Sequence, residues 1–166
     1  VGSAVRDGDL ASALNTLAIT SPSKRVAQLA RKLAQVAGGT KVEVVNNLKG
    51  ADGTPAAGLF DPQTNTIKLD ATTGINPHTI LHETTHAATS ATLSNSSHPM
   101  TKQLTKLFND VKDSLGTYYG SQNVDEFASE AFGNPDFQRE LSRIYPDGSP
   151  ISALQRFKNV VGNFVR

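Results

Sequence analysis

Cysteine is absent from the 166-residue chain. This absence excludes a thiol nucleophile, a CxxC redox pair, an iron–sulfur cluster and every zinc site that uses a thiolate ligand. A metal ion bound by this protein would need histidine, aspartate or glutamate ligands. The chain has four histidines, so their positions are the first features to follow.

The sequence also lacks an excess of charge of one sign and a long apolar segment. Its 16 basic residues are balanced by 15 acidic residues, which gives no indication of a nucleic-acid partner. No apolar run approaches the roughly 20 residues of a membrane span, and no signal peptide is recognisable. These absences predict a soluble protein with no nucleic-acid or membrane partner. Because the chain begins at Val1 rather than methionine, we expect a fragment or a processed product of a longer protein.

Hydrophobic periodicity predicts two helices within residues 1–38, separated by a Ser-Pro-Ser sequence at residues 21–23. The alternating sequence KVEVV at residues 41–45 predicts a β-strand. Two further short strands, at residues 58–60 and 66–69, flank a segment rich in turn-forming residues. The spacing of these two strands predicts a β-hairpin.

The remainder of the chain is predicted to be helical. Asn76 is a suitable N-cap and Pro77 suits the first position of a helix, where its missing N–H costs nothing. Apolar residues at spacings of three and four predict five helices, at residues 77–92, 99–115, 124–132, 135–144 and 151–164.

This order of elements predicts an α+β fold. We expect a small antiparallel or mixed sheet packed on the helix at residues 77–92, followed by a mainly helical half. A single domain over residues 1–166 is expected at this length. Its parts would be an N-terminal helical segment (1–38), the sheet with the first long helix (41–92) and the remaining helices (99–166).

Two of the four histidines lie in the pentapeptide HETTH, at residues 82–86 within the helix predicted at 77–92. Residues four apart share one face of a helix, so His82 and His86 can bind one Zn²⁺ at about 2.0–2.1 Å. Glu83 projects about 100° around the helix from His82, where it can accept a proton from a water that the metal activates. The pattern predicts one catalytic zinc ion per chain. Ordinary structural histidines are the alternative, and the helical context argues against it.

Two histidines do not complete a catalytic zinc site, which uses three protein ligands. The segment DEFASEAFG at residues 125–133 places Glu126 and Glu130 on the polar face of a predicted helix. One carboxylate can bind zinc while the other accepts the ring N–H of a ligand histidine, and either order is possible. A purely structural alternative is a capping box, because Asn123 and Glu126 have its spacing.

HETTH combined with DEFASEAFG resembles the gluzincin branch of the zincin metallopeptidases, whose second motif reads Asn-Glu-x-x-Ser-Asp. Asp125 then stands at the position of the motif's asparagine, and Glu126 at the position of its ligand glutamate. Ser129 matches the serine, and Glu130 stands at the position of the second acidic residue. The sequence departs from the motif at Asp125 and at Glu130, whose side chain is one methylene longer than aspartate.

This resemblance implies that zinc is bound by His82, His86 and Glu126. It makes Glu83 the general base, and it makes Glu130 the carboxylate that supports a ligand histidine. Because Glu130 is longer than the aspartate it replaces, Glu130 as the third ligand stays an open alternative.

In the same family a hairpin precedes the active-site helix, and its outer strand pairs with extended peptide substrate. The resemblance makes Gly58, Leu59 and Phe60 the substrate-binding edge, with residues 66–70 as the inner strand. Residues 57–140 also resemble metallopeptidase-like domains of large phage and mobile-element polyproteins. Such an origin would make the protein cytoplasmic or virion-associated.

Gluzincins usually place a tyrosine or histidine, sometimes with an arginine, where it donates to the oxyanion of the reaction. One such donor is worth about 3–4 kcal/mol. No spacing rule selects among the available side chains, which are Tyr118, Tyr119, His98, Arg143 and Tyr145. We name Tyr119, just before the second motif, as the candidate, and half-buried rings without a catalytic role are the alternative. His78 and His98 have no assigned role.

These features predict a zinc-dependent peptidase, and more specifically an endopeptidase, acting on a peptide or protein substrate. One rival is a non-catalytic interaction or assembly module of a larger, phage-type protein. Another is a peptidase that stays latent until it is released from its parent chain. The presence of Glu83 argues against a pure binding module, because a structural zinc needs no general base. Nothing in the sequence indicates an oligomeric state.

Overall fold

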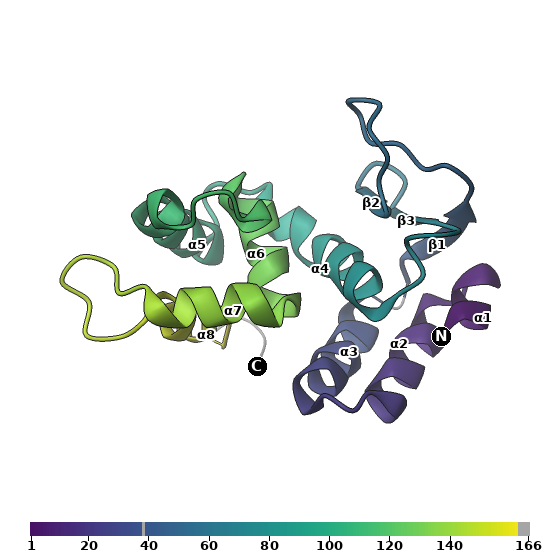
Figure 1. Cartoon of the computed structure of the whole chain (residues 1–166), viewed down its shortest axis with the longest axis horizontal. Coiled ribbons are helices and arrows are strands. Elements are labelled where there is room, and N and C mark those ends of the chain that lie inside the picture. The colour runs from purple at the N-terminus through teal and green to yellow at the C-terminus, as the bar shows by residue number, and fades with distance from the viewer. Residues whose placement is uncertain (38, 163–166) are drawn as a thin grey trace. The chain divides into compact units, whose positions relative to one another are not determined.

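The computed structural model of the protein describes residues 1–37 and 39–162 (Figure 1). Residue 38, at the expected end of the N-terminal helical segment, and residue 164, at the expected end of the last helix, lie outside the described residues. The chain divides into two compact units, Val1–Ala88 and Thr89–Arg166. The single domain expected over residues 1–166 stays a prediction.

The described residues form an α+β fold that is mostly helical, as predicted. The first unit contains α1 (Gly2–Arg6), α2 (Leu10–Thr20), α3 (Lys24–Ala37), a three-stranded sheet and most of α4 (Pro77–Leu93). The second unit contains α5 (Pro99–Val111), α6 (Val124–Gly133), α7 (Pro135–Arg143), α8 (Ala153–Gly162) and two short 3-10 helices, η1 (Lys112–Ser114) and η2 (Tyr119–Ser121). Within the described ranges, no helix is both long and apolar enough to cross a membrane.

Helix α5 ends before the residue that the sequence predicted. The apolar pattern continues to Leu115, but the α-helix stops at Val111 and continues as the tighter η1. Gly116 then has a φ angle of 57°, in the left-handed region that glycine adopts at little cost. The glycine therefore ends the whole helical segment rather than the α-helix itself.

The sheet of the first unit is mixed, with the strand order β1-β3-β2. Its strands are β1 (Lys41–Val45), β2 (Gly58–Asp61) and β3 (Thr66–Asp70). The predicted hairpin is confirmed, because β2 and β3 pair antiparallel with Phe60 opposite Ile67. A wholly antiparallel sheet is excluded, since β1 pairs parallel with β3 and places Lys41 opposite Thr66. β3 is thus the central strand, and β2 is an edge strand among the described residues.

The apolar face of this sheet belongs to the core of the first unit. Ile67 and Leu69 of β3 are buried in one cluster with residues of α1, α2 and α3, and with Ile80 and Leu81 of α4. In Figure 1, α2 and α3 lie side by side in this unit. Full burial of a leucine or isoleucine side chain contributes about 1.5–3 kcal/mol. This burial fixes the first turns of α4 against the helices and the sheet.

The core of the second unit is built around phenylalanine rings. Phe127 of α6 is fully buried, and its ring contacts Phe108 of α5, Phe137 of α7 and Phe157 of α8. The ring centroids are 5.7, 5.9 and 6.1 Å from that of Phe127, with the rings edge to face. α6 is therefore the central helix of this unit.

Asp70, the last residue of β3, connects three parts of the first unit. Its Oδ2 accepts a hydrogen bond of 2.9 Å from the Leu48 N–H, and its Oδ1 accepts bonds of 2.9 and 3.0 Å from the N–H groups of Thr72 and Thr73. Its own N–H donates to the Ala57 carbonyl at 2.8 Å. The bonds to the carboxylate, first of all the one from Leu48, lower the pKa of Asp70 to about 2. Asp70 thus holds the loop before β2 and the turn that leads to α4.

We expect Asp70→Asn to destabilise the protein at neutral pH, because one amide oxygen cannot replace both carboxylate oxygens. The pKa of Asp70 in the folded state lies below its ordinary value of 3.8. Its stabilising contribution is therefore complete above about pH 4 and is lost as the pH falls towards 2. Urea unfolding followed by circular dichroism should show a difference between wild type and variant that shrinks over this range.

Asp52→Asn is the matched control, because the pKa of Asp52 is also lowered but its carboxylate accepts local hydrogen bonds, from the N–H and hydroxyl of Thr54 two residues away. Its effect should be small at every pH. A loss of stability in Asp52→Asn equal to that in Asp70→Asn would contradict the bridging role of Asp70.

Candidate metal centre

The helix that carries HETTH begins where the sequence predicted. Asn76 caps it, because its Oδ1 accepts a hydrogen bond of 2.9 Å from the Thr79 N–H. The Asn76 amide also donates to the Thr73 carbonyl at 2.8 Å, which joins the cap to the turn held by Asp70. Pro77 is the first residue of α4. This start fixes the register of the helix and so the direction in which each histidine points.

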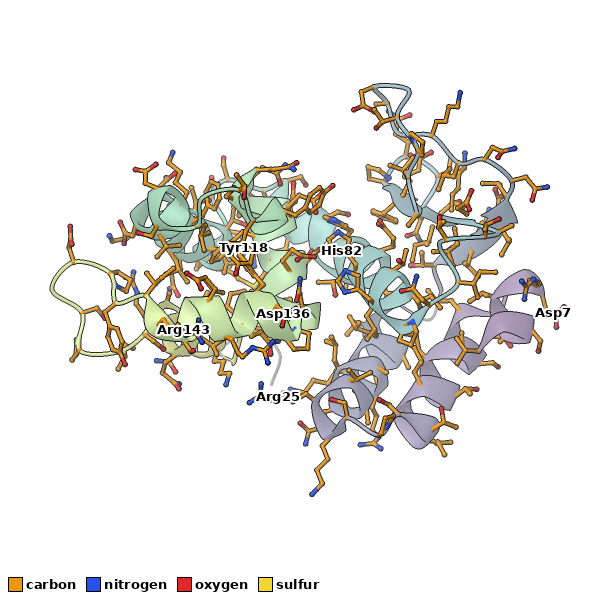
Figure 2. All side chains as sticks on the ribbon, viewed as in Figure 1. Asp7, Arg25, His82, Tyr118, Asp136 and Arg143 are labelled. Atoms are coloured by element: carbon orange, nitrogen blue, oxygen red, sulfur yellow. The ribbon has the colours of Figure 1, made fainter. Side chains whose placement is uncertain are left out.

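His82 and His86 turn their rings towards one another on α4. Their Nε2 atoms are 3.1 Å apart and their ring centroids 4.8 Å apart. Two nitrogens bound to one tetrahedral zinc at 2.0–2.1 Å would lie about 3.3 Å apart. His82, labelled in Figure 2, is only 9% exposed, whereas His86 is half-buried. The residues present therefore fit a zinc ion without a change of helix geometry.

The two threonines between these histidines are buried in the first unit. Thr84 Oγ1 donates to the Ile80 carbonyl at 2.6 Å, and Thr85 Oγ1 donates to the Leu81 carbonyl at 2.8 Å. Their hydroxyls are thus satisfied inside the helix, as burial requires. These residues hold this turn of α4 in the core, so packing fixes the orientation of the histidine pair.

Glu83 lies against the backbone of the edge strand β2. Its side chain is 7% exposed, and a Cβ atom added to Gly58 would lie 2.6 Å from Glu83 Cγ and 2.8 Å from Thr79 Cγ2. Only glycine permits this approach without displacing a neighbour. The sequence analysis placed Gly58 in the substrate-binding edge but missed its contact with Glu83. The available signal was a glycine within an otherwise apolar strand.

The other two residues of the predicted edge point to opposite sides of β2. Phe60 shares the face of Gly58 and packs against the core of the first unit. Leu59 faces the other way and is 38% exposed. Phe60 therefore attaches β2 to the core of the first unit, and the backbone of β2 at Gly58 lies beside Glu83.

In the second unit, Glu126 lies in the first turn of α6. The side-chain Oδ1 of Asn123 accepts a hydrogen bond of 2.9 Å from the Glu126 N–H, so Asn123 is the N-cap that the spacing predicted. This bond uses the backbone N–H of Glu126 and not its carboxylate. The Glu126 side chain is half-buried.

Glu130, one turn later, is 5% exposed and belongs to the junction between α6 and α7. Its Oε2 accepts a hydrogen bond of 2.6 Å from the Asn134 side-chain amide. Asn134 in turn caps α7, since its Oδ1 accepts a bond of 3.0 Å from the Asp136 N–H. Glu130 therefore has a structural role in its own unit, whatever else it does.

The side chains proposed as oxyanion donors also lie in the second unit. Tyr119 is the first residue of η2 and is 51% exposed. The ring of Tyr118 packs 5.7 Å from that of Phe137, and the guanidinium of Arg143 lies 3.8 Å from the Glu140 carboxylate. Tyr119 as a catalytic residue stays a prediction.

His98, which had no assigned role, is the N-cap of α5. Its Nδ1 accepts a hydrogen bond of 3.2 Å from the Met100 N–H. The first unit thus brings together His82, His86, Glu83 and Gly58. The second unit carries Glu126 and Glu130 on α6.

Comparisons of the chain with protein-family models, with curated proteins and with solved structures gave no match. The resemblance to the gluzincins therefore stays a prediction that depends on the sequence at residues 82–86 and 125–133.

We expect Gly58→Ala to lower the free energy of unfolding by about 1–3 kcal/mol, because the new methyl group overpacks the contact with Glu83 and Thr79. Gly39→Ala is the matched control in the same unit, since a Cβ at Gly39 meets nothing within 4 Å. Chemical denaturation of both variants makes the comparison. Equal stabilities would contradict the close contact between β2 and Glu83.

Proposed function

We propose that the protein is a zinc-dependent peptidase of the gluzincin type, and more specifically an endopeptidase. The observation that supports this most is the grouping of two histidine Nε2 atoms 3.1 Å apart with the buried carboxylate of Glu83 beside an edge strand. Two imidazoles without a thiolate suit a catalytic zinc rather than a structural one. Each chain would bind one zinc ion.

Glu126 is the third zinc ligand in this proposal, and Glu130 supports a ligand histidine. If the Glu130 carboxylate moved to bind a metal, it would leave the Asn134 amide without the acceptor that it has at 2.6 Å. Loss of a buried hydrogen bond to a charged group costs about 1.5–3 kcal/mol. Glu126 matches the family's ligand position, and the Asn134 amide bonds to Glu130 instead.

Zinc, when bound, supplies Lewis acidity that makes a water more acidic and polarises a peptide carbonyl. The protein's own residues then move the protons. Glu83 accepts a proton from the attacking water and returns it to the nitrogen of the departing amine. Its burial beside β2 keeps this carboxylate in one place. Tyr119 donates to the oxyanion that forms at the substrate carbonyl.

The substrate binds as an added strand along β2. Main-chain hydrogen bonds to an edge strand act on any peptide sequence, which suits a protease that recognises extended chains. Because Gly58 lies against Glu83, a peptide paired with this strand passes close to the proposed base. The half-exposed Leu59 offers an apolar contact for a substrate side chain on the other face.

We expect the purified protein to bind about one zinc per chain, and Glu83→Gln to keep the zinc while turnover of a peptide library falls by about 10²–10⁴. Glu43→Gln, at an exposed carboxylate of β1, should change neither property. Metal analysis and peptide cleavage followed by mass spectrometry measure the two quantities separately. A chain that binds no zinc when zinc is offered contradicts the site. If wild type and Glu83→Gln both bind zinc and neither cleaves a peptide, the result would favour the non-catalytic module.

We further expect Glu126→Ala to weaken zinc binding more than Glu130→Ala, whose effect should be in the range of about 10–100-fold for a supporting group. Glu130→Ala should also lower the stability of the second unit, because it removes the acceptor of the Asn134 amide. Zinc titration and chemical denaturation of both variants check these expectations, and the reverse order of zinc affinities would make Glu130 the ligand.

A further inference from the structure

A third histidine continues the row on α4 that contains the proposed zinc ligands. His78, His82 and His86 recur at intervals of four residues and so share one face of the helix. The ring centroids of His78 and His82 are 6.0 Å apart, and a ring nitrogen of one lies within 4.8 Å of a ring nitrogen of the other. His82 therefore lies between two histidines, each one helical turn away.

The three histidines of the row differ in exposure, since His78 is exposed, His82 is buried and His86 is half-buried. His78 is exposed in the first turn of α4, whereas His82 is 9% exposed and Glu83 is 7% exposed. A hydrated zinc ion must lose several waters before it can bind the buried His82 together with the half-buried His86. An exposed ligand beside the pair allows these waters to be replaced one at a time.

We propose that His78 is a loading ligand for the zinc site. Zinc first binds His78 and His82, and the bond to His78 then breaks as a bond to His86 forms. His82 keeps the ion throughout, one imidazole nitrogen replaces another, and no electron is transferred. This inference rests on the proposed function, because it concerns how metal reaches that site.

The position of His78 makes its bond to the metal a temporary one. It lies at the N-terminal end of α4, where the backbone N–H groups give a partial positive charge that disfavours a bound cation. The effect fades beyond the first turn, so His86 does not experience it. The rings of His82 and His86 are also closer together, at 4.8 Å against 6.0 Å between centroids. Both differences favour transfer from His78 to His86.

The test compares the rates of zinc binding and release with the affinity at equilibrium. In the full chain, His78→Gln removes the proposed loading ligand and leaves His82 and His86 in place. Stopped-flow measurements would follow zinc association and zinc release to an excess of chromogenic chelator. Both rates should slow by about tenfold, the lower end of the range for a group that supports a metal site. The dissociation constant should stay unchanged. His78→Asp, which keeps a ligand atom at this position, should restore most of both rates.

Three outcomes would overturn the loading role. Unchanged rates in His78→Gln would show that zinc reaches the site by another route. A weaker dissociation constant, comparable to that of His86→Ala, would make His78 a permanent ligand. No zinc binding by the wild type would remove the proposed function together with this inference, whereas the first two results leave the peptidase proposal standing.

Discussion

The carboxylate of Asp70 is the group on which the geometry of the first unit depends. It stands at the end of the central strand and accepts hydrogen bonds from the loop before β2 and from the turn before α4. The same turn contains Gly74, where an added Cβ would lie only 2.1 Å from the Ala57 carbonyl oxygen. The start of α4 and the start of β2 are thus packed backbone against backbone. The contact between Glu83 and Gly58 follows from that packing.

Local signals made α4 predictable. The Asn76 cap, Pro77 and the histidine spacing all act within a few residues, so they can be read from the sequence. The bond between Leu48 and Asp70 joins residues 22 positions apart, and no periodicity reports it. The parallel pairing of β1 with β3 could not be predicted either, because the alternating pattern of a strand does not specify which strand it pairs with or in which direction. Helix α1 was missed as a separate element since five residues are too few to show a helical period.

The candidate site illustrates a second limit of sequence. Glu126 and Glu130 fit a ligand pair, but their segment also fits ordinary helix capping, and the structure contains the caps. Asn123 binds the backbone of Glu126, and Asn134 binds the carboxylate of Glu130 while capping α7. A buried carboxylate in this position stabilises the unit and is compatible with a supporting role near a metal. Pattern alone could not separate these roles, because both use the same residue types at the same spacing.

The short edge strand β2 also limits what can pair with it. Proline has no N–H, and Pro55 and Pro62 lie on either side of this strand. The Ala56 N–H already donates to the Leu48 carbonyl at 3.0 Å, so the backbone donors for an added strand lie within β2. An open edge normally allows copies of a protein to join one another into long sheets. Here the two prolines restrict any such pairing to a few residues, and this opposes extended association between copies.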